Sequence, residues 1–229
     1  PLLGIVPGMR WVWAIRALLM VGSIGFSLVV AELAATLVAR GAYPYLNLFI
    51  TDPKLGVALE ANATTRVKSR LGRSTRNDTD RFGRRIHPTG AGPTRVLLLG
   101  DSQSFGYLVD AEGAVAAQLG RITGAEVIDA AVPSYGPHEY VRVAERLVPE
   151  LEPDYVLFVA NVANDWWEAN VDNTRRSTAR DGWLASLSGD KSEPFEFPGR
   201  RFLFGRSHLF LAARRVAAPL PAARRVRIG

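Results

Sequence analysis

The chain has 229 residues, 48% of them hydrophobic, and a formal net charge of +6. That length and apolar content suit one domain with an accessory segment. The absence of cysteine excludes disulfides, thiolate catalysis and Cys-ligated zinc. The basic residues are mostly scattered arginines without interleaved aromatic side chains, so we expect no nucleic-acid partner.

The first predicted element is an apolar segment, 17–38, in which Glu32 is the only ionisable residue. Such a segment is long enough to cross a hydrocarbon layer about 30 Å thick. Arg10, Arg16 and Trp13 precede it, which is typical of a cytoplasmic flank and an interfacial aromatic belt. We expect an uncleaved membrane anchor with Glu32 near its outer end, where the carboxylate reaches interfacial water or pairs with a neighbour. A cleavable signal peptide and a buried core helix are the alternatives.

The next segment, 39–92, is polar and rich in turn residues, so it predicts a strap without a core of its own. The pattern then changes to short apolar runs that alternate with helical segments. This order predicts a parallel sheet covered by helices, and therefore the α/β class. The expected strands are 95–99, 126–132 and 154–161, and the expected helices are 112–124 and 137–151. Pro149 predicts a stop or kink near the end of the second helix, and 170–206 is interpreted as a long excursion and a candidate cover for the site.

Polar residues follow each predicted strand, at the sheet edge where ligands bind in such folds. The first of these stretches is "GDSQSFG", in which Gly100 and Gly106 flank Asp101 and Ser102. A serine at a strand-to-helix turn gains free backbone N–H groups that can stabilise an oxyanion. Ser102 is therefore either a nucleophile or, with Ser104, a simple helix cap. Asn164, after the third strand, favours the nucleophile because its amide is a suitable oxyanion donor.

These stretches together resemble the SGNH (GDSL-like) hydrolases. The resemblance rests on "GDSQSFG" at 100–106, "DAAVPSYGPHEY" at 129–140 and "VAND" at 162–165, in the order and spacing of the family. It is closest to bacterial members with a membrane anchor and a strap, whose motifs appear here as "TDPKLG" and "NDTDRFGR". It implies a three-layer α/β/α, flavodoxin-like fold.

The resemblance also implies the roles of individual residues. Ser102 would be the nucleophile and, through its backbone N–H, the first oxyanion donor. The backbone N–H of Ser134, where the family usually has glycine, would be the second donor, and the side chain of Asn164 the third. Substrate contacts are expected from His138 and Trp166, although a tryptophan at Trp166 or Trp167 is also a candidate for the core. No metal or cofactor is implied.

The family takes its base from a late Asp-x-x-His motif, in which Asp orients the His that activates serine. None of the three histidines has an aspartate three residues before it: His87, His138 and His208 follow Arg84, Tyr135 and Gly205 at that spacing. We expect His87 to lie in a surface loop and His208 to be a capping or surface residue. The chain is therefore expected to be an incomplete hydrolase, truncated before that motif, or a true pseudoenzyme with little or no esterase activity.

The resulting prediction is a serine esterase or acyltransferase that acts on acyl esters of cell-envelope glycans, with acetyl as the candidate acyl group. A glycan-binding scaffold of the same fold is the alternative. A nucleotide-binding domain is disfavoured because neither glycine-rich phosphate motif is present. We expect a single-pass protein of the bacterial inner membrane with its α/β domain outside the cytoplasm. The expected parts are a cytoplasmic stub (1–16), an anchor (17–38), a strap (39–92) and a partial hydrolase domain (93–229).

Overall fold

The computed structural model describes residues 7–69, 72–187 and 195–217. The chain divides into two compact units. One unit combines the N-terminal residues Pro1–Gly41 with Ser207–Gly229, and the other consists of Ala42–Arg206. We describe each unit by itself.

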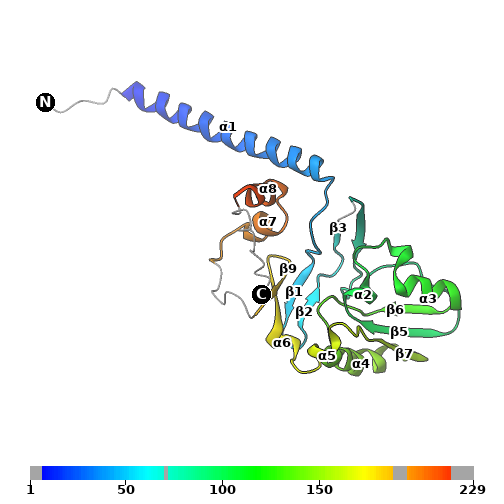
Figure 1. Ribbon diagram of the computed structural model, residues 1–229. Helices are drawn as coiled ribbons and strands as arrows, with labels where there is room; N and C mark the ends of the chain where they lie inside the picture. The colour runs from blue at the N-terminus through cyan, green and yellow to red at the C-terminus, as the bar shows by residue number, and fades with distance from the viewer. Residues whose placement is uncertain (1–6, 70–71, 188–194, 218–229) are drawn as a thin grey trace, which may run out of the picture. The chain divides into compact units, whose positions relative to one another are not determined.

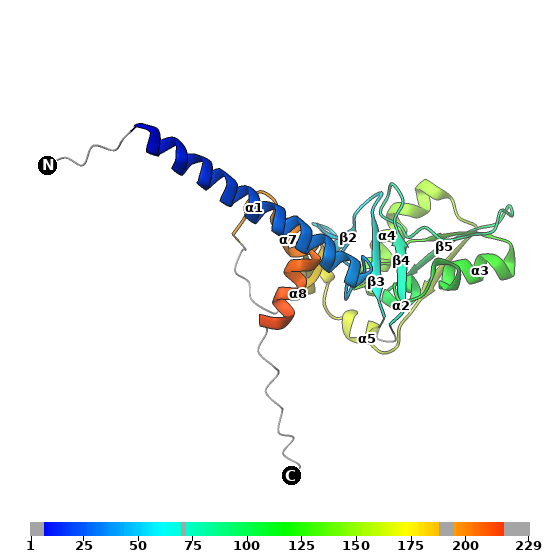
Figure 2. The same cartoon turned by 90° about the horizontal axis from the view of Figure 1, so that it is seen from above.

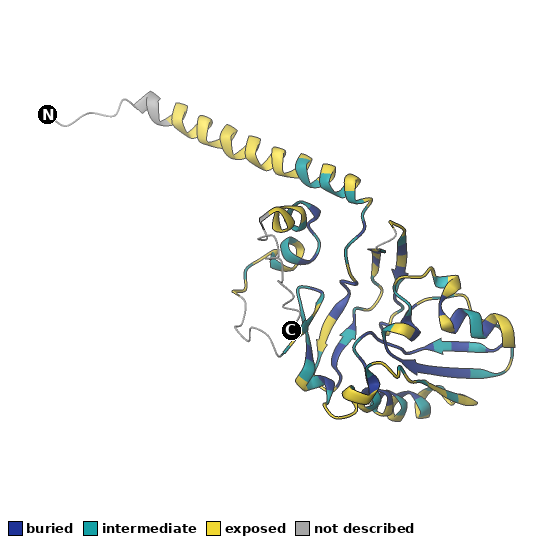
Figure 3. Ribbon diagram, in the orientation of Figure 1, coloured by how far each residue is buried: buried dark blue, intermediate teal, exposed yellow. Residues whose placement is uncertain are grey.

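The first unit contains the long helix α1 (Pro7–Ala39) and the short helix α8 (His208–Ala217). Part of α1, Trp11–Ala39, is long and apolar enough to cross a membrane. Its side chains are exposed along most of this length, as Figure 3 shows. The predicted apolar helix is therefore confirmed, and it begins ten residues earlier than the expected start at Ala17. The alternative of a buried core helix is wrong, because none of the residues in the most apolar window of this helix is buried.

The second unit is mixed α/β and is built around a small parallel sheet (Figure 1). Among the described residues this sheet has the strand order β6-β5-β7, with both pairings parallel. The strands are β5 (Arg95–Gly100), β6 (Glu126–Asp129) and β7 (Tyr155–Val159). Strands β6 and β7 lie within the predicted strands 126–132 and 154–161, and β5 extends the predicted 95–99 by one residue. The predicted α/β class with a parallel sheet is therefore confirmed. The central strand β5 is almost entirely buried, as its continuous apolar run requires.

The helices of this unit pack against the sheet: α3 (Val115–Thr123) contacts β6, and α4 (Pro137–Leu151) contacts β5. Gly124 ends α3 in the left-handed conformation, with φ of 74°, as predicted. The predicted stop near Pro149 is confirmed, because α4 ends at Leu151, two residues after it. Before α3 come the single turn α2 (Ser102–Phe105) and the 3₁₀ turn η1 (Ala111–Gly113).

The strap contains more regular structure than expected. It forms two antiparallel hairpins, β1 (Phe49–Asp52) with β2 (Gly56–Leu59), and β3 (Thr64–Lys68) with β4 (Ser74–Asp78). The hydrophobic pattern does not predict the second hairpin, because most of its inward-facing residues are polar: Thr65, Thr75 and Asn77 are buried beside Val67. The hairpins join the same hydrophobic core as the sheet, which agrees with the prediction that the strap has no core of its own.

The predicted long excursion after β7 contains regular structure. It holds a third hairpin of β8 (Ser177–Arg180) and β9 (Trp183–Ser186). Three short helices accompany this hairpin: α5 (Asp165–Glu168), α6 (Asn173–Arg176) and α7 (Arg200–Gly205). Strand β8 packs beside β1 of the strap, so the two segments that sequence reasoning treated as connectors stabilise each other.

Candidate functional site

The candidate site lies at the carboxyl edge of the parallel sheet. Because β6, β5 and β7 run in the same direction, the loops that follow them leave from the same edge. Ser102 follows β5, Ser134 follows β6, and Asn164 follows β7. The fold therefore brings the three predicted oxyanion and nucleophile residues to one edge of the sheet.

Ser102 is the half-buried first residue of α2, and it is not the cap of that helix. Asp101 occupies the cap position, and one of its carboxylate oxygens accepts a hydrogen bond of 2.8 Å from the backbone N–H of Gln103. The other oxygen accepts one of 2.8 Å from the side-chain amide of Asn161, in the loop after β7. The Ser102 hydroxyl and backbone N–H have no hydrogen-bond partner within the described ranges. The capping interpretation of Ser102 is therefore wrong.

Two glycines permit the sharp turn that presents Ser102. A Cβ atom on Gly100 would lie 2.3 Å from the Oγ atom of Ser104, which is itself buried. Gly106 has φ of 66° and ends α2 by donating its N–H to the carbonyl of Ser102. A larger residue at Gly100 would displace the turn, and one at Gly106 would be strained.

Ser134 occupies the left-handed region, with φ of 87°, a conformation that glycine adopts more readily. Its hydroxyl donates to Oδ1 of Asn173 at 3.0 Å and lies 2.8 Å from the hydroxyl of Ser177. These side-chain contacts offset a backbone strain of about 1–2 kcal/mol. The backbone N–H of Ser134 has no acceptor among the described residues. Ser134 thus retains the tight turn expected of glycine, and the Ser134 N–H remains available as a donor.

Asn164 precedes α5 and is tied to a partly buried ion pair. Its Nδ2 atom donates to Glu168 at 2.8 Å, and Glu168 in turn pairs with Arg176 at 2.7 Å. Burial raises the pKa of Glu168, while the Arg176 charge opposes that rise. Because Nδ2 carries two hydrogens, one remains for an oxyanion, and the Arg176 charge offsets the carboxylate beside it. Asn164 is therefore held in place without losing its capacity to donate.

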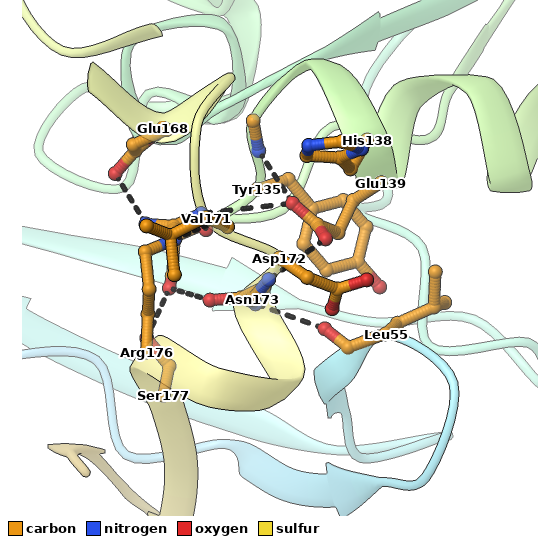
Figure 4. Close-up of polar contacts among 12 residues, drawn as sticks. Leu55, Tyr135, His138, Glu139, Glu168, Val171, Asp172, Asn173, Arg176 and Ser177 are labelled. Carbon is orange, nitrogen blue, oxygen red and sulfur yellow. Dashed lines mark hydrogen bonds and ion pairs between the residues drawn. The ribbon is translucent and has the colours of Figure 1, made fainter.

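A buried carboxylate, Glu139, organises the loops around the Glu168–Arg176 ion pair (Figure 4). Its side chain is fully buried and accepts from the N–H of Gly136 at 3.1 Å and from that of Asn173 at 3.0 Å. Arg176 lies 3.6 Å away, and the Asn173 amide donates to the carbonyl of Leu55 in the strap. Sequence reasoning missed Glu139, although a glutamate three residues after the start of a helix is a known capping signal.

Arg85 supports the Ser102 turn from the strap, and sequence reasoning missed it as well. Its buried guanidinium donates to the carbonyls of Phe105, the last residue of α2, and of Gly106 and Val109 in the turn that follows. Burial lowers the pKa of Arg85, and the nearby Asp129 partly restores it. Nothing in the helix or strand periodicity marks this residue, because its partners are backbone carbonyls that are distant in sequence.

Asp129, at the end of β6, gives a prediction for the pH dependence of stability. Burial raises its pKa to about 7, although the Ala131 N–H and the Arg85 charge oppose that rise. The folded chain therefore keeps a proton that the unfolded chain releases near its ordinary pKa of 3.8. Stability from this group is complete below pH 3.8 and falls as the pH rises to about 7.

We expect the Asp129→Asn variant to lack this dependence. Its free energy of unfolding, compared with that of the wild type, should rise between pH 5 and pH 8, as measured by urea denaturation at both values. Subtracting the wild-type curve removes the groups that titrate equally in both proteins. Parallel stability curves across this range would contradict the buried, protonated state of Asp129.

The three histidines and two tryptophans occupy different surroundings. His87 is half-buried in the strap, and the exposed His138 shares a hydrogen bond of 3.0 Å with the Ala169 carbonyl. His208 belongs to the other unit and is buried as the first residue of α8, whose capping residue is Ser207, so the expectation of a capping or surface residue is wrong. Trp166 and Trp167 are 79% and 75% exposed, which rules out a place in the core.

The described residues contain no cluster of three or more His, Asp or Glu side chains suited to a metal ion.

Comparisons with known proteins do not identify a family for this chain. No protein-family model matches the sequence. No curated protein matches it either. The assignment of a function therefore depends on the residues of the site.

Proposed function

We propose that the carboxyl edge of the sheet is a serine ester hydrolase or acyltransferase site of the SGNH type. The observation that carries the proposal is the presence of Ser102, Ser134 and Asn164 on three loops of one sheet edge. The backbone N–H groups of the two serines have no partner among the described residues, and Asn164 retains one amide hydrogen. The finer fold assignment, a three-layer α/β/α arrangement, belongs to the same proposal.

The arrangement suits acyl transfer. The Ser102 oxygen attacks the carbonyl carbon of an ester, and the carbonyl oxygen acquires negative charge in the tetrahedral intermediate. The N–H groups of Ser102 and Ser134 and the amide of Asn164 supply three donors for that charge. Removing one such donor typically slows an acyl-transfer enzyme by about 10²–10³-fold. Solvent takes up the Ser102 proton, the ester oxygen takes one up and leaves as the alcohol, and water or another hydroxyl then removes the acyl group from Ser102.

The step that these residues do not perform is removal of the Ser102 proton. All three histidines are described, and none hydrogen-bonds to the Ser102 hydroxyl. A serine without a general base is a poor nucleophile at neutral pH. We therefore propose that this chain by itself turns over esters slowly, with its oxyanion donors in place.

The setting of the site follows from α1 and the exposed aromatic residues. We propose a single-pass anchor in a bacterial inner membrane, with arginines on the cytoplasmic flank and the α/β unit outside the cytoplasm. An extracytoplasmic site fits acyl esters, including acetyl esters, of envelope glycans. Trp166 and Trp167 offer exposed ring faces beside Asn164 for stacking on a sugar. No cofactor enters this chemistry.

A non-catalytic glycan-binding protein is the second candidate, favoured by the same exposed tryptophans and by the unassisted Ser102. The two candidates differ in their response to p-nitrophenyl acetate and to sugars. A catalytic site predicts slow turnover that drops further in the Ser102→Ala variant. Turnover unchanged by Ser102→Ala, together with glycan binding that is lost on Trp166→Ala, would favour the binding protein and contradict the catalytic proposal.

A further inference from the structure

Helix α8 packs beside α1 (Figure 2). Glu32, the acidic residue near the C-terminal end of α1, holds the first turn of α8. The Glu32 carboxylate accepts hydrogen bonds from the Ser207 hydroxyl at 2.6 Å and from the backbone N–H groups of His208 at 2.8 Å and Leu209 at 3.2 Å. Ser207 in turn caps the helix by accepting the N–H of Phe210 at 3.0 Å. The first turn of α8 is thereby attached to α1 through a charge at the positive end of the helix dipole.

The position of Glu32 along α1 sets the level at which α8 begins. Trp13 lies in the aromatic stretch at the start of the apolar helix, and the rise from Trp13 to Glu32 is about 28 Å at 1.5 Å per residue. This distance is close to the thickness of a hydrocarbon layer, about 30 Å. If tryptophan occupies one interface, Glu32 and the start of α8 reach the other. The sequence expectation that Glu32 pairs with a neighbour is confirmed, and the neighbour is the N-terminus of a second helix.

The composition of α8 fits such a surface. Viewed along a helix of 3.6 residues per turn, Leu209, Ala213 and Val216 fall on one side, and Arg214 and Arg215 lie away from its centre. Val216 is 88% exposed, and both arginines are exposed. The sequence from Ser207 to Gly229 contains five arginines and no acidic residue. Ala213 is exposed as well, and Leu209 is half-buried. A largely exposed apolar stripe bordered by arginine is typical of a helix that lies in a membrane–water interface.

We propose that α8 lies in the interface of an anionic phospholipid bilayer, in the leaflet at the C-terminal end of α1. The apolar stripe enters the acyl–headgroup boundary, and Arg214 and Arg215 bind lipid phosphate groups. Glu32 fixes the helix at that depth. The inference rests on the membrane anchor of the proposed function and is independent of chemistry at Ser102.

The test places a polarity-sensitive fluorophore on single cysteines, since the chain has none of its own. The full chain carries Val216→Cys, Phe26→Cys or Ile122→Cys and is reconstituted in nanodiscs of phosphatidylcholine with phosphatidylglycerol. Phe26 is 72% exposed on α1 and reports on the anchor, whereas Ile122 is 74% exposed on α3 in the other unit and serves as the aqueous control. Depth is measured as quenching by spin-labelled lipid and by aqueous iodide.

We expect lipid quenching at Val216→Cys and Phe26→Cys and iodide quenching at Ile122→Cys. Replacing both arginines by glutamine, or omitting phosphatidylglycerol, should reduce lipid quenching at Val216→Cys and leave Phe26→Cys unchanged. Iodide quenching at Val216→Cys with lipid quenching at Phe26→Cys would overturn the inference and preserve the anchor. Protection from both quenchers would show a protein covering α8 and also overturn it. Iodide quenching at Phe26→Cys would overturn the anchor and the inference together.

Discussion

Replacing Glu139 with alanine is expected to lower the free energy of unfolding by about 2–5 kcal/mol, because each buried N–H group left without an acceptor costs about 1–3 kcal/mol. The variant leaves the N–H groups of Gly136 and Asn173 without an acceptor and removes a carboxylate that faces Arg176. Arg176 keeps its 2.7 Å ion pair with Glu168, so the main cost is that of the two buried N–H groups left without an acceptor. The loops that carry Ser134 and Asn164 should therefore loosen first.

The measurement is urea denaturation of the full chain in detergent, followed by tryptophan fluorescence. Glu145→Ala is the matched control, because Glu145 is exposed on the same helix, and it should change the free energy by no more than about 0.5 kcal/mol. Glu139→Gln retains one acceptor oxygen and should fall between the wild type and Glu139→Ala. Equal effects of Glu139→Ala and Glu145→Ala would contradict the assigned network.

Replacing Arg85 with methionine is expected to lower the free energy of unfolding by about 2–4 kcal/mol. The substitution retains much of the side-chain volume and removes the donors for three carbonyls: those of Phe105, Gly106 and Val109. Each buried carbonyl left without a donor costs about 1–3 kcal/mol, and relaxation recovers part of that loss. It also removes the positive charge that faces the buried Asp129.

Arg81→Met is the matched control for Arg85→Met. Arg81 belongs to the same strap, and it is exposed. Hydrogen exchange should speed up at the amides of Phe105 and Gly106 in the Arg85→Met variant, and not in Arg81→Met. If both variants unfold at the same urea concentration, Arg85 does not support the turn that presents Ser102.

The parts of the fold that could be predicted are those with local signals. Strands β5 and β7 are short apolar runs, and α4 is amphipathic, so their positions follow from periodicity. The hairpins of the strap could not be predicted in this way. The inward face of β3 and β4 is mostly threonine and asparagine, and these residues are satisfied by partners such as the carbonyl of Tyr107. A pattern based on hydrophobicity does not detect a buried face made of polar residues.

The site shows the same division. Ser102, Ser134 and Asn164 could be placed together because parallel strands deliver their following loops to one edge. The side chains that hold those loops, Glu139 and Arg85, could not be assigned, since their partners are backbone groups distant in sequence. Glu32 lies between these cases: its apolar surroundings predicted a partner, and only the structure identified the start of α8.

The proposed acyl-transfer site contains a nucleophile, Ser102, and three oxyanion donors, and neither His87 nor His138, the described histidines of the same unit, hydrogen-bonds to Ser102. The most direct test supplies the missing base. The full chain is incubated with a fluorophosphonate probe, with and without imidazole, and the modified residue is located by mass spectrometry. Ser104→Ala is the matched control, because Ser104 is a buried serine two residues away.

We expect the probe to modify Ser102 slowly and imidazole to accelerate that modification. The Ser102→Ala variant should not be modified in this way, and Ser104→Ala should behave much like the wild type. Asn164→Ala should reduce the imidazole-assisted rate by about 10²–10³-fold. Failure to modify Ser102 in the presence of imidazole, or equal rates for the wild type and Asn164→Ala, would contradict the central claim.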